Sequence, residues 1–259
     1  MSGATYLKRS GLDFFVAVQF LTRIPVPKLA YDPGSLSRAV KFFPVVGLLI
    51  GGAAAVAHLL LAPHLPRLIV ALLVISLLVL LTGCLHEDGL ADSADAFGGG
   101  WKREQVLAIL KDSRIGSYGA AALILSILAR VLLLAALPLN QIAQYLIAAH
   151  VLCRWTTLPL SYYLAPARHP VEEPAASQGA RIARLTTRGT LIAASILSFG
   201  IVLIALKRSS VAAIAATLLI ALLSASYYKR RIGGVTGDCF GATNQLTEIA
   251  VYLTGVWVA

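Results

Sequence analysis

The chain has few charged residues and few cysteines for its length. Only 13% of its 259 residues are charged, whereas 58% are hydrophobic, and the mean hydropathy is +0.80. A soluble globular domain does not need so apolar a composition to bury its core, so a membrane protein is predicted. The three cysteines, Cys84, Cys153 and Cys239, lie far apart without CxxC spacing. This spacing argues against a disulfide framework and against a zinc site.

Acidic residues are also scarce, with 12 Asp and Glu against 22 Lys and Arg, which gives a net charge of +10. No basic run is interleaved with aromatic residues as a base-stacking groove requires, so nucleic acid is not an expected partner. The basic excess instead indicates membrane topology and attraction to anionic lipid.

Long apolar stretches recur along the chain, and a spanning helix needs about 20 such residues. The candidates are 42–61, 68–85, 117–137, 141–163, 190–206, 210–227 and 242–258. The alternating polarity of a transmembrane β-barrel is absent. We therefore expect one integral membrane domain over 1–259, an all-α polytopic bundle of about seven transmembrane helices.

The cations predict the orientation of this bundle. Most Lys and Arg residues fall in the N-terminal segment 1–41 and in the second, fourth and sixth connections, which the positive-inside rule assigns to the cytoplasm. The remaining cations are Arg67, Arg130, Arg154, Lys207 and Arg208. The polar segments 86–116 and 228–248 both open on the cytoplasmic side, where they can share one site.

The stretch "GCLHEDGLADSADAFGGG" at 83–100 concentrates acidic residues directly after an apolar run. If it is helical, the side chains of Asp88, Asp92 and Asp95 fall within roughly 60° of one another, and Glu87 points about 100° away from Asp88. Like charges on one face repel unless a cation neutralises them. Oxygen ligands favour Mg²⁺ completed by substrate phosphate, so a diphosphate site is predicted. A solvated acidic loop and a proton or cation pathway remain open.

A second polar segment reads "GGVTGDCFGATNQLTE" at 233–248. A glycine-rich turn entering a helix presents amides that bind anions, which makes Gly237, Asp238 and Gly241 candidates for substrate binding; Asp238 could equally be a helix cap. Asn244 and Glu248, which are further candidates for substrate binding, share a helix face one turn apart inside the last apolar stretch.

Three arginines could neutralise a phosphate or an acid. Arg154 lies in an apolar stretch at a depth from which it can reach a phosphate, and we expect Arg130 to pair with an acid such as Glu248. Arg114 follows the acidic stretch in a segment that suits an interfacial helix, where lipid headgroups are the alternative contact.

The quoted motifs, together with "KDSRIGSYG" and the N-terminal "QFLTRIPVP", resemble the cobalamin 5′-phosphate synthase family, also called adenosylcobinamide-GDP ribazoletransferase. The resemblance implies a bacterial inner-membrane enzyme of vitamin B12 assembly. It would join adenosylcobinamide-GDP to α-ribazole or its 5′-phosphate, release GMP and need Mg²⁺. The family's functional positions fall on Glu87, Asp88, Asp92, Asp95, Arg154, Gly237, Asp238 and Gly241.

Our hypothesis is that Asp88 and Asp92, with Glu87 as a weaker candidate, hold the metal, and that Asp95 completes the site or acts as general base. Further groups would complete the metal site, orient the acceptor or neutralise phosphate: Asp238, Glu248, Arg114 and Arg154. Two alternatives are a CDP-alcohol-type phosphotransferase, whose DGxxAR motif is broken here, and a cation-coupled transporter, for which no internal repeat is visible.

Overall fold

The computed structural model describes residues 3–27, 34–112, 114–168 and 186–258. Over these ranges the regular structure is helical, apart from an isolated bridge between Pro166 and Val235. The predicted all-α class is confirmed.

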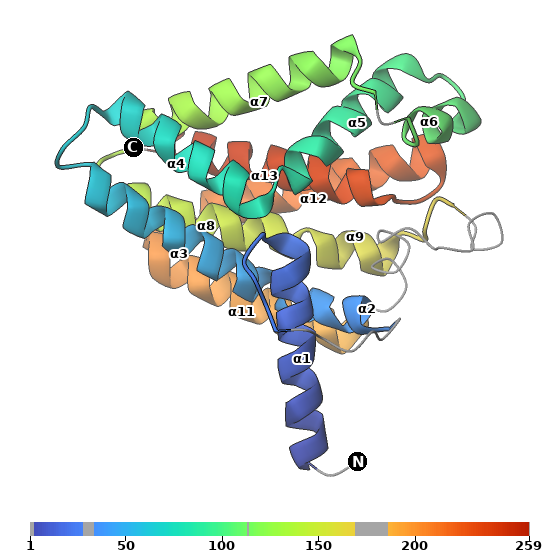
Figure 1. Ribbon diagram of the computed structural model, residues 1–259, viewed down its shortest axis with the longest axis horizontal. Coiled ribbons are helices and arrows are strands. Elements are labelled where there is room, and N and C mark those ends of the chain that lie inside the picture. The colour runs from blue at the N-terminus through green and yellow to red at the C-terminus, as the bar shows by residue number, and fades with distance from the viewer. Residues whose placement is uncertain (1–2, 28–33, 113, 169–185, 259) are drawn as a thin grey trace.

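Most of the long helices run along the long axis of the molecule (Figure 1). These are α3 (Phe43–Leu61), α7 (Ser117–Ala136), α8 (Ile142–Trp155), α11 (Arg188–Leu206), α12 (Ser210–Ile232) and α13 (Gly237–Trp257). Helix α1 (Gly3–Leu21) crosses them, and α4 (Arg67–Thr82) meets α5 (Leu85–Gly99) at a bend of 88°. The short elements are α2 (Ser35–Ala39), η1 (Val40–Phe42), α6 (Arg103–Ile109), α9 (Thr157–Tyr163) and η2 (Lys207–Ser209).

Helices occupy every predicted span, but fewer described stretches pass a test of length and apolarity for crossing a bilayer. Three described stretches pass, namely Ser35–Leu61, Ser117–Ala136 and Arg188–Ile232. The number rises to four if the bent pair α4–α5 is counted as a single span. Leucine and isoleucine side chains cover the outer surface, for example Ile204 at 81% exposure. The protein is thus a helical membrane protein, and the count of seven spans stays a prediction. Three cations of the predicted cytoplasmic segments, Lys28, Arg181 and Arg184, lie outside the described residues.

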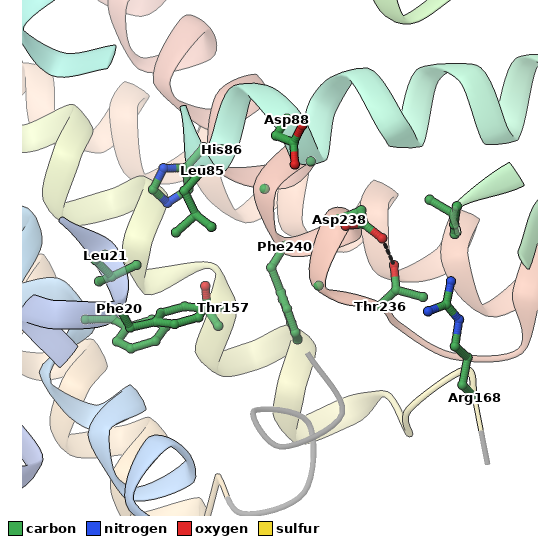
Figure 2. A pocket seen from close by; sticks show the side chains of 15 residues that line it. Phe20, Leu21, Leu85, His86, Asp88, Thr157, Arg168, Thr236, Asp238 and Phe240 are labelled. Atoms are coloured by element: carbon green, nitrogen blue, oxygen red, sulfur yellow. Dashed lines mark hydrogen bonds between the residues drawn. The ribbon is translucent and has the colours of Figure 1, made fainter. Parts of the chain in front are cut away.

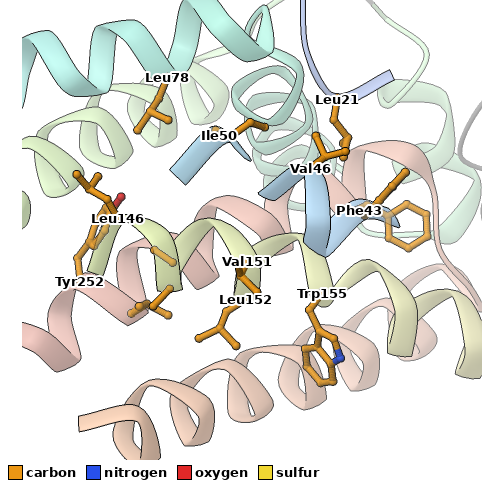
Figure 3. Close-up of a cluster of buried hydrophobic side chains, with 14 of the residues drawn as sticks. Leu21, Phe43, Val46, Ile50, Leu78, Leu146, Val151, Leu152, Trp155 and Tyr252 are labelled. Atoms are coloured by element: carbon orange, nitrogen blue, oxygen red, sulfur yellow. The ribbon is translucent and has the colours of Figure 1, made fainter. Parts of the chain in front are cut away.

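The centre of the bundle is the contact between α3 and α8. A Cβ atom on Gly51 would lie 2.7 Å from the carbonyl oxygen of Leu146, so the two backbones touch. Small residues of this kind let membrane helices approach closely. Figure 3 shows Val46 and Ile50 of α3 on one side of α8, and Leu152 of α8 pointing to the other side, toward α11.

The turn between α4 and α5 determines where the acidic helix points. Gly83 and Cys84 both have left-handed backbones, with φ of 63° and 59°, and Cys84 accepts the first α5 hydrogen bond from Asp88 N–H at 2.9 Å. Glycine adopts this conformation without strain, whereas a cysteine there is uncommon. The two residues redirect the chain so that α5 crosses α13.

Candidate active site

The acidic helix α5 crosses α13 through a pair of glycines. A Cβ atom on Gly89 would lie 2.9 Å from the carbonyl oxygen of Asp238 and 3.1 Å from Cα of Gly241. Backbone atoms cannot move aside as a flexible side chain can, so only glycine fits. Because Gly89 follows Asp88, this crossing brings Asp88 and Asp238 to one place, as the sequence predicts.

A cavity of about 330 Å³ opens at the crossing. Figure 2 shows Asp88 and Asp238 on neighbouring helices, with Arg168 approaching from a separate segment. The polar and glycine lining comprises His86, Asp88, Gly89, Thr157, Arg168, Thr236, Gly237, Asp238 and Gly241. The apolar lining comprises Phe20, Leu21, Phe43, Leu85, Leu110 and Phe240. The cavity therefore suits a ligand that carries both charged and apolar groups.

Negative charge is concentrated along this edge of the cavity. The carboxylate of Asp92 is repelled by those of Asp88, Asp238 and Asp95. Asp238 accepts a hydrogen bond from Thr236 Oγ1 at 3.3 Å and is attracted by Arg168. Carboxylates held this close favour binding of a cation between them.

The donor set indicates what kind of metal ion fits. In the described part of the chain, no group of three His, Cys, Asp or Glu side chains is arranged to hold a metal. Mg²⁺, however, commonly takes only one or two carboxylates and fills its other positions with water and phosphate oxygens. Asp88 and Asp92 therefore fit a metal bound jointly with a phosphate-containing ligand, and not a metal held by protein alone.

Asp95 has a different neighbourhood from the other acids of α5. Its two oxygens accept hydrogen bonds from Gly116 N at 2.7 Å and from Gly119 N at 2.8 Å. These are amides at the start of α7, which lack partners within the helix. The carboxylate thus caps α7, and the glycines of "KDSRIGSYG" are the sequence signal for this contact, since a Cβ at either would overlap Asp95.

Arg114 lies on the exposed segment before α7 and does not line the cavity. Its guanidinium lies 2.6 Å from the Asp112 carboxylate. The hydrogen bonds from Arg114 lower the pKa of Asp112 to about 2. Among the described residues, the arginine that lines this cavity is Arg168, which the sequence analysis counted only as one of the basic residues of the fourth connection.

A separate cluster of charges is buried inside the bundle. Arg130 Nη1 lies 2.9 Å from Glu87 Oε1 and 3.6 Å from Glu248 Oε2, so the predicted pairing of Arg130 with Glu248 is confirmed. His150 Nε2 lies 3.9 Å from Glu248 Oε1, and Arg154 Nη1 lies 2.5 Å from His150 Nδ1. The cluster joins α5, α7, α8 and α13, and none of these five side chains lines the cavity.

The remaining candidates divide between cavity and core. Gly237 and Gly241 line the cavity beside Asp238. Asn244, one turn further along α13, is buried at 2% exposure and lies outside the cavity lining. Thr236 is an additional cavity residue that sequence reasoning missed, although it directly precedes the Gly-Asp motif.

Comparison with known proteins adds the chemistry. The family model of cobalamin-5-phosphate synthase matches residues 13–256. The chain belongs to the cobalamin-5-phosphate synthase family. A protein of Sinorhizobium medicae is 44% identical, covering 92% of this chain and 94% of its own. One of Azorhizobium caulinodans is 42% identical over 95% of each chain, and one of Polaromonas sp. is 39% identical over 93% and 95%.

Each of these three relatives is named adenosylcobinamide-GDP ribazoletransferase. No solved structure matches the chain. Membership of the cobalamin-5-phosphate synthase family makes the protein a transferase of cobalamin biosynthesis.

Proposed function

We propose that the protein transfers the adenosylcobinamide-phosphate group from adenosylcobinamide-GDP to α-ribazole or α-ribazole 5′-phosphate, with release of GMP. The names of the relatives support these substrates. The observation that carries the proposal is the contact between Gly89 and Gly241, which brings Asp88 beside Asp238 at a cavity that also contains Arg168.

Asp88 and Asp92 would hold Mg²⁺ together with the diphosphate of the donor. When bound, the ion would neutralise diphosphate charge and stabilise the leaving phosphate. Arg168 lies on the Asp238 side of the same cavity, where its guanidinium can bind phosphate oxygens and offset their charge.

The reaction exchanges one phosphorus–oxygen bond for another. A ribose hydroxyl of the acceptor bonds to the phosphorus attached to cobinamide, and the bond from that phosphorus to the GMP oxygen breaks. The proton of the hydroxyl passes to a carboxylate, for which we assign Asp238 because it lines the cavity from α13, a different helix from that of the proposed metal ligands. Asp95 is not assigned this role, because its two oxygens already accept hydrogen bonds from the α7 amides.

We place the site at the cytoplasmic end of a seven-span bundle in the bacterial inner membrane. Figure 1 supports this placement, since α6, α9 and the turn between α12 and α13 lie at one end, opposite the C-terminus. The basic residues Lys102, Arg103, Arg168 and 229–231 belong to that end, as the positive-inside rule requires.

The deciding experiment is GMP release by the purified protein in detergent. We expect turnover of adenosylcobinamide-GDP with either acceptor in Mg²⁺, loss of turnover in excess EDTA, and recovery when Mg²⁺ is restored. Asp88→Asn and Asp92→Asn should each abolish release, whereas Asp112→Asn, which alters an exposed acid outside the cavity, should not. Normal turnover in both α5 variants would contradict the proposal. Substrate movement that needs sealed vesicles, without GMP release, would favour the transporter.

A further inference from the structure

A second cavity adjoins the first and shares Phe20, Leu85 and Asp88 with it. Its volume is about 670 Å³, against about 330 Å³ for the first. The first cavity is completed by α13 and Arg168, whereas the second is completed by the end of α1 and the α4–α5 turn. The two cavities therefore meet at Asp88 and extend from it between different helices.

The polar wall of the second cavity differs from that of the first. Besides Asp88 it contains one cation, Arg23, and the neutral groups of Gln19, Thr22 and Thr82. Within the described residues, the Arg23 guanidinium forms no ion pair with an acid. The planar guanidinium of an arginine suits a phosphate monoester, because it can donate two parallel hydrogen bonds to the phosphate oxygens.

The chain around Arg23 is anchored so that the side chain has a defined place. The backbone N–H of Arg23 donates to Leu81 O at 2.8 Å, which ties the residue to the last turn of α4. Its side chain lies over Gly83, where a Cβ would overlap the guanidinium nitrogen Nε. Helix α1 is further held by Asp13, which accepts a hydrogen bond from Arg38 Nε at 3.2 Å. Arg23 is thus presented to the cavity by tertiary contacts.

The two cavities differ in the charged groups that line them. The first cavity holds the acids Asp88 and Asp238, with Asp92 next to them, so a diphosphate would bind there together with a divalent cation. The second cavity has a cation and only the shared Asp88, so a singly phosphorylated molecule can bind there without a metal. A transfer reaction needs its acceptor and donor to meet, and the shared wall at Asp88 is where they would do so.

We propose that the second cavity binds the acceptor and that Arg23 binds its 5′-phosphate. This assignment rests on the proposed function. The family is named for a product that carries a 5-phosphate, and the relatives are named adenosylcobinamide-GDP ribazoletransferases. Arg23 is then the residue that makes the enzyme prefer the phosphorylated acceptor over the unphosphorylated one.

The test compares both acceptors in the same protein. With saturating adenosylcobinamide-GDP and Mg²⁺, kcat/KM is measured for α-ribazole 5′-phosphate and for α-ribazole. The measured quantity is kcat/KM for α-ribazole 5′-phosphate divided by kcat/KM for α-ribazole. In Arg23→Gln we expect this ratio to fall by about 10- to 100-fold, the usual range for loss of a charge-assisted hydrogen bond. Arg23→Lys keeps the positive charge but loses the two parallel donors of the guanidinium, so its ratio should lie between those of the unaltered protein and Arg23→Gln. Arg208→Gln, in the turn between α11 and α12, removes a cation outside both cavities and should leave the ratio unchanged.

An unchanged ratio in Arg23→Gln would overturn the assignment. A KM increase for adenosylcobinamide-GDP that is equal with both acceptors would place Arg23 on the donor diphosphate instead, which also overturns it. Loss of activity with both acceptors in both Arg23 variants would do the same, because the role would not be confined to the acceptor phosphate. Failure of the proposed function is distinguishable, since the unaltered protein would then release no GMP with either acceptor.

Discussion

Substitution of Gly89 by alanine tests the geometry of the site most directly. The added Cβ would lie 2.9 Å from the carbonyl oxygen of Asp238, where ordinary contacts begin at 3.4 Å. Helices α5 and α13 must therefore separate by about 0.5 Å, because the two nearest atoms, the Asp238 carbonyl oxygen and Gly241 Cα, belong to the backbone. Overpacking of this kind costs about 1–3 kcal/mol of stability. Because a 1 Å misplacement of reacting groups costs about 100-fold in rate, half of that displacement should lower kcat/KM by about 10-fold.

The assay for Gly89→Ala is GMP release in detergent, with thermal unfolding measured on the same sample. Gly52→Ala in α3 is the matched control, since a Cβ there would have no atom within 4 Å. This control should leave turnover unchanged and stabilise the helix by about 0.5–1 kcal/mol. If Gly89→Ala turned over at the rate of the unaltered protein while remaining folded, the close crossing of α5 and α13 would not be what positions Asp88 against Asp238 for catalysis.

Other substitutions separate chemistry from structure. Asp95→Ala removes the cap of α7 and should lower the free energy of unfolding by about 1–2 kcal/mol, whereas Asp88→Ala should leave the melting temperature nearly unchanged while abolishing GMP release. Equal losses of melting temperature in the two would refute this distinction. Arg130→Met leaves the buried Glu87 without its ion-pair partner and should cost about 3–5 kcal/mol, seen as poor recovery of folded protein; normal recovery would show that the ion pair is not needed. Arg114→Gln should release GMP at nearly the normal rate, and a large loss of activity would indicate that Arg114 contacts the substrate.

Local periodicity was sufficient to predict the acidic helix. The 3.6-residue repeat of α5 places Asp88 and Asp92 together, and the cation count brings Asp238 to the same side of the membrane. Both inferences use only short-range spacing or the distribution of charge along the chain. The sequence alone therefore specifies that Asp88 and Asp92 share a helix face and that Asp238 lies on the same side of the bundle.

Long-range partners were not predictable in the same way. Asp95 lies on the acidic face of α5, but its hydrogen bonds go to amides 21 and 24 residues later, and only the fold brings Gly116 and Gly119 to it. The role of Arg23 depends on the bend at Gly83, which no hydropathy pattern indicates. In each case, the partner of a charge is determined by helix packing and not by the residue types near it.

The adjacent residues Glu87 and Asp88 show why the acids gather at this bend. Glu87 is 5% exposed and bonded to Arg130, so it fixes α5 against α7, while Asp88 is exposed at the cavities. A rotation of α5 by one residue, about 100°, would bury Asp88 and withdraw Glu87 from Arg130. Since an unpaired charge inside the bundle is strongly unfavourable, the buried pair holds the helix in the one orientation that presents Asp88 and Asp92 to a ligand. The same short stretch thus supplies both the proposed metal ligands and the buried carboxylate whose ion pair with Arg130 orients them.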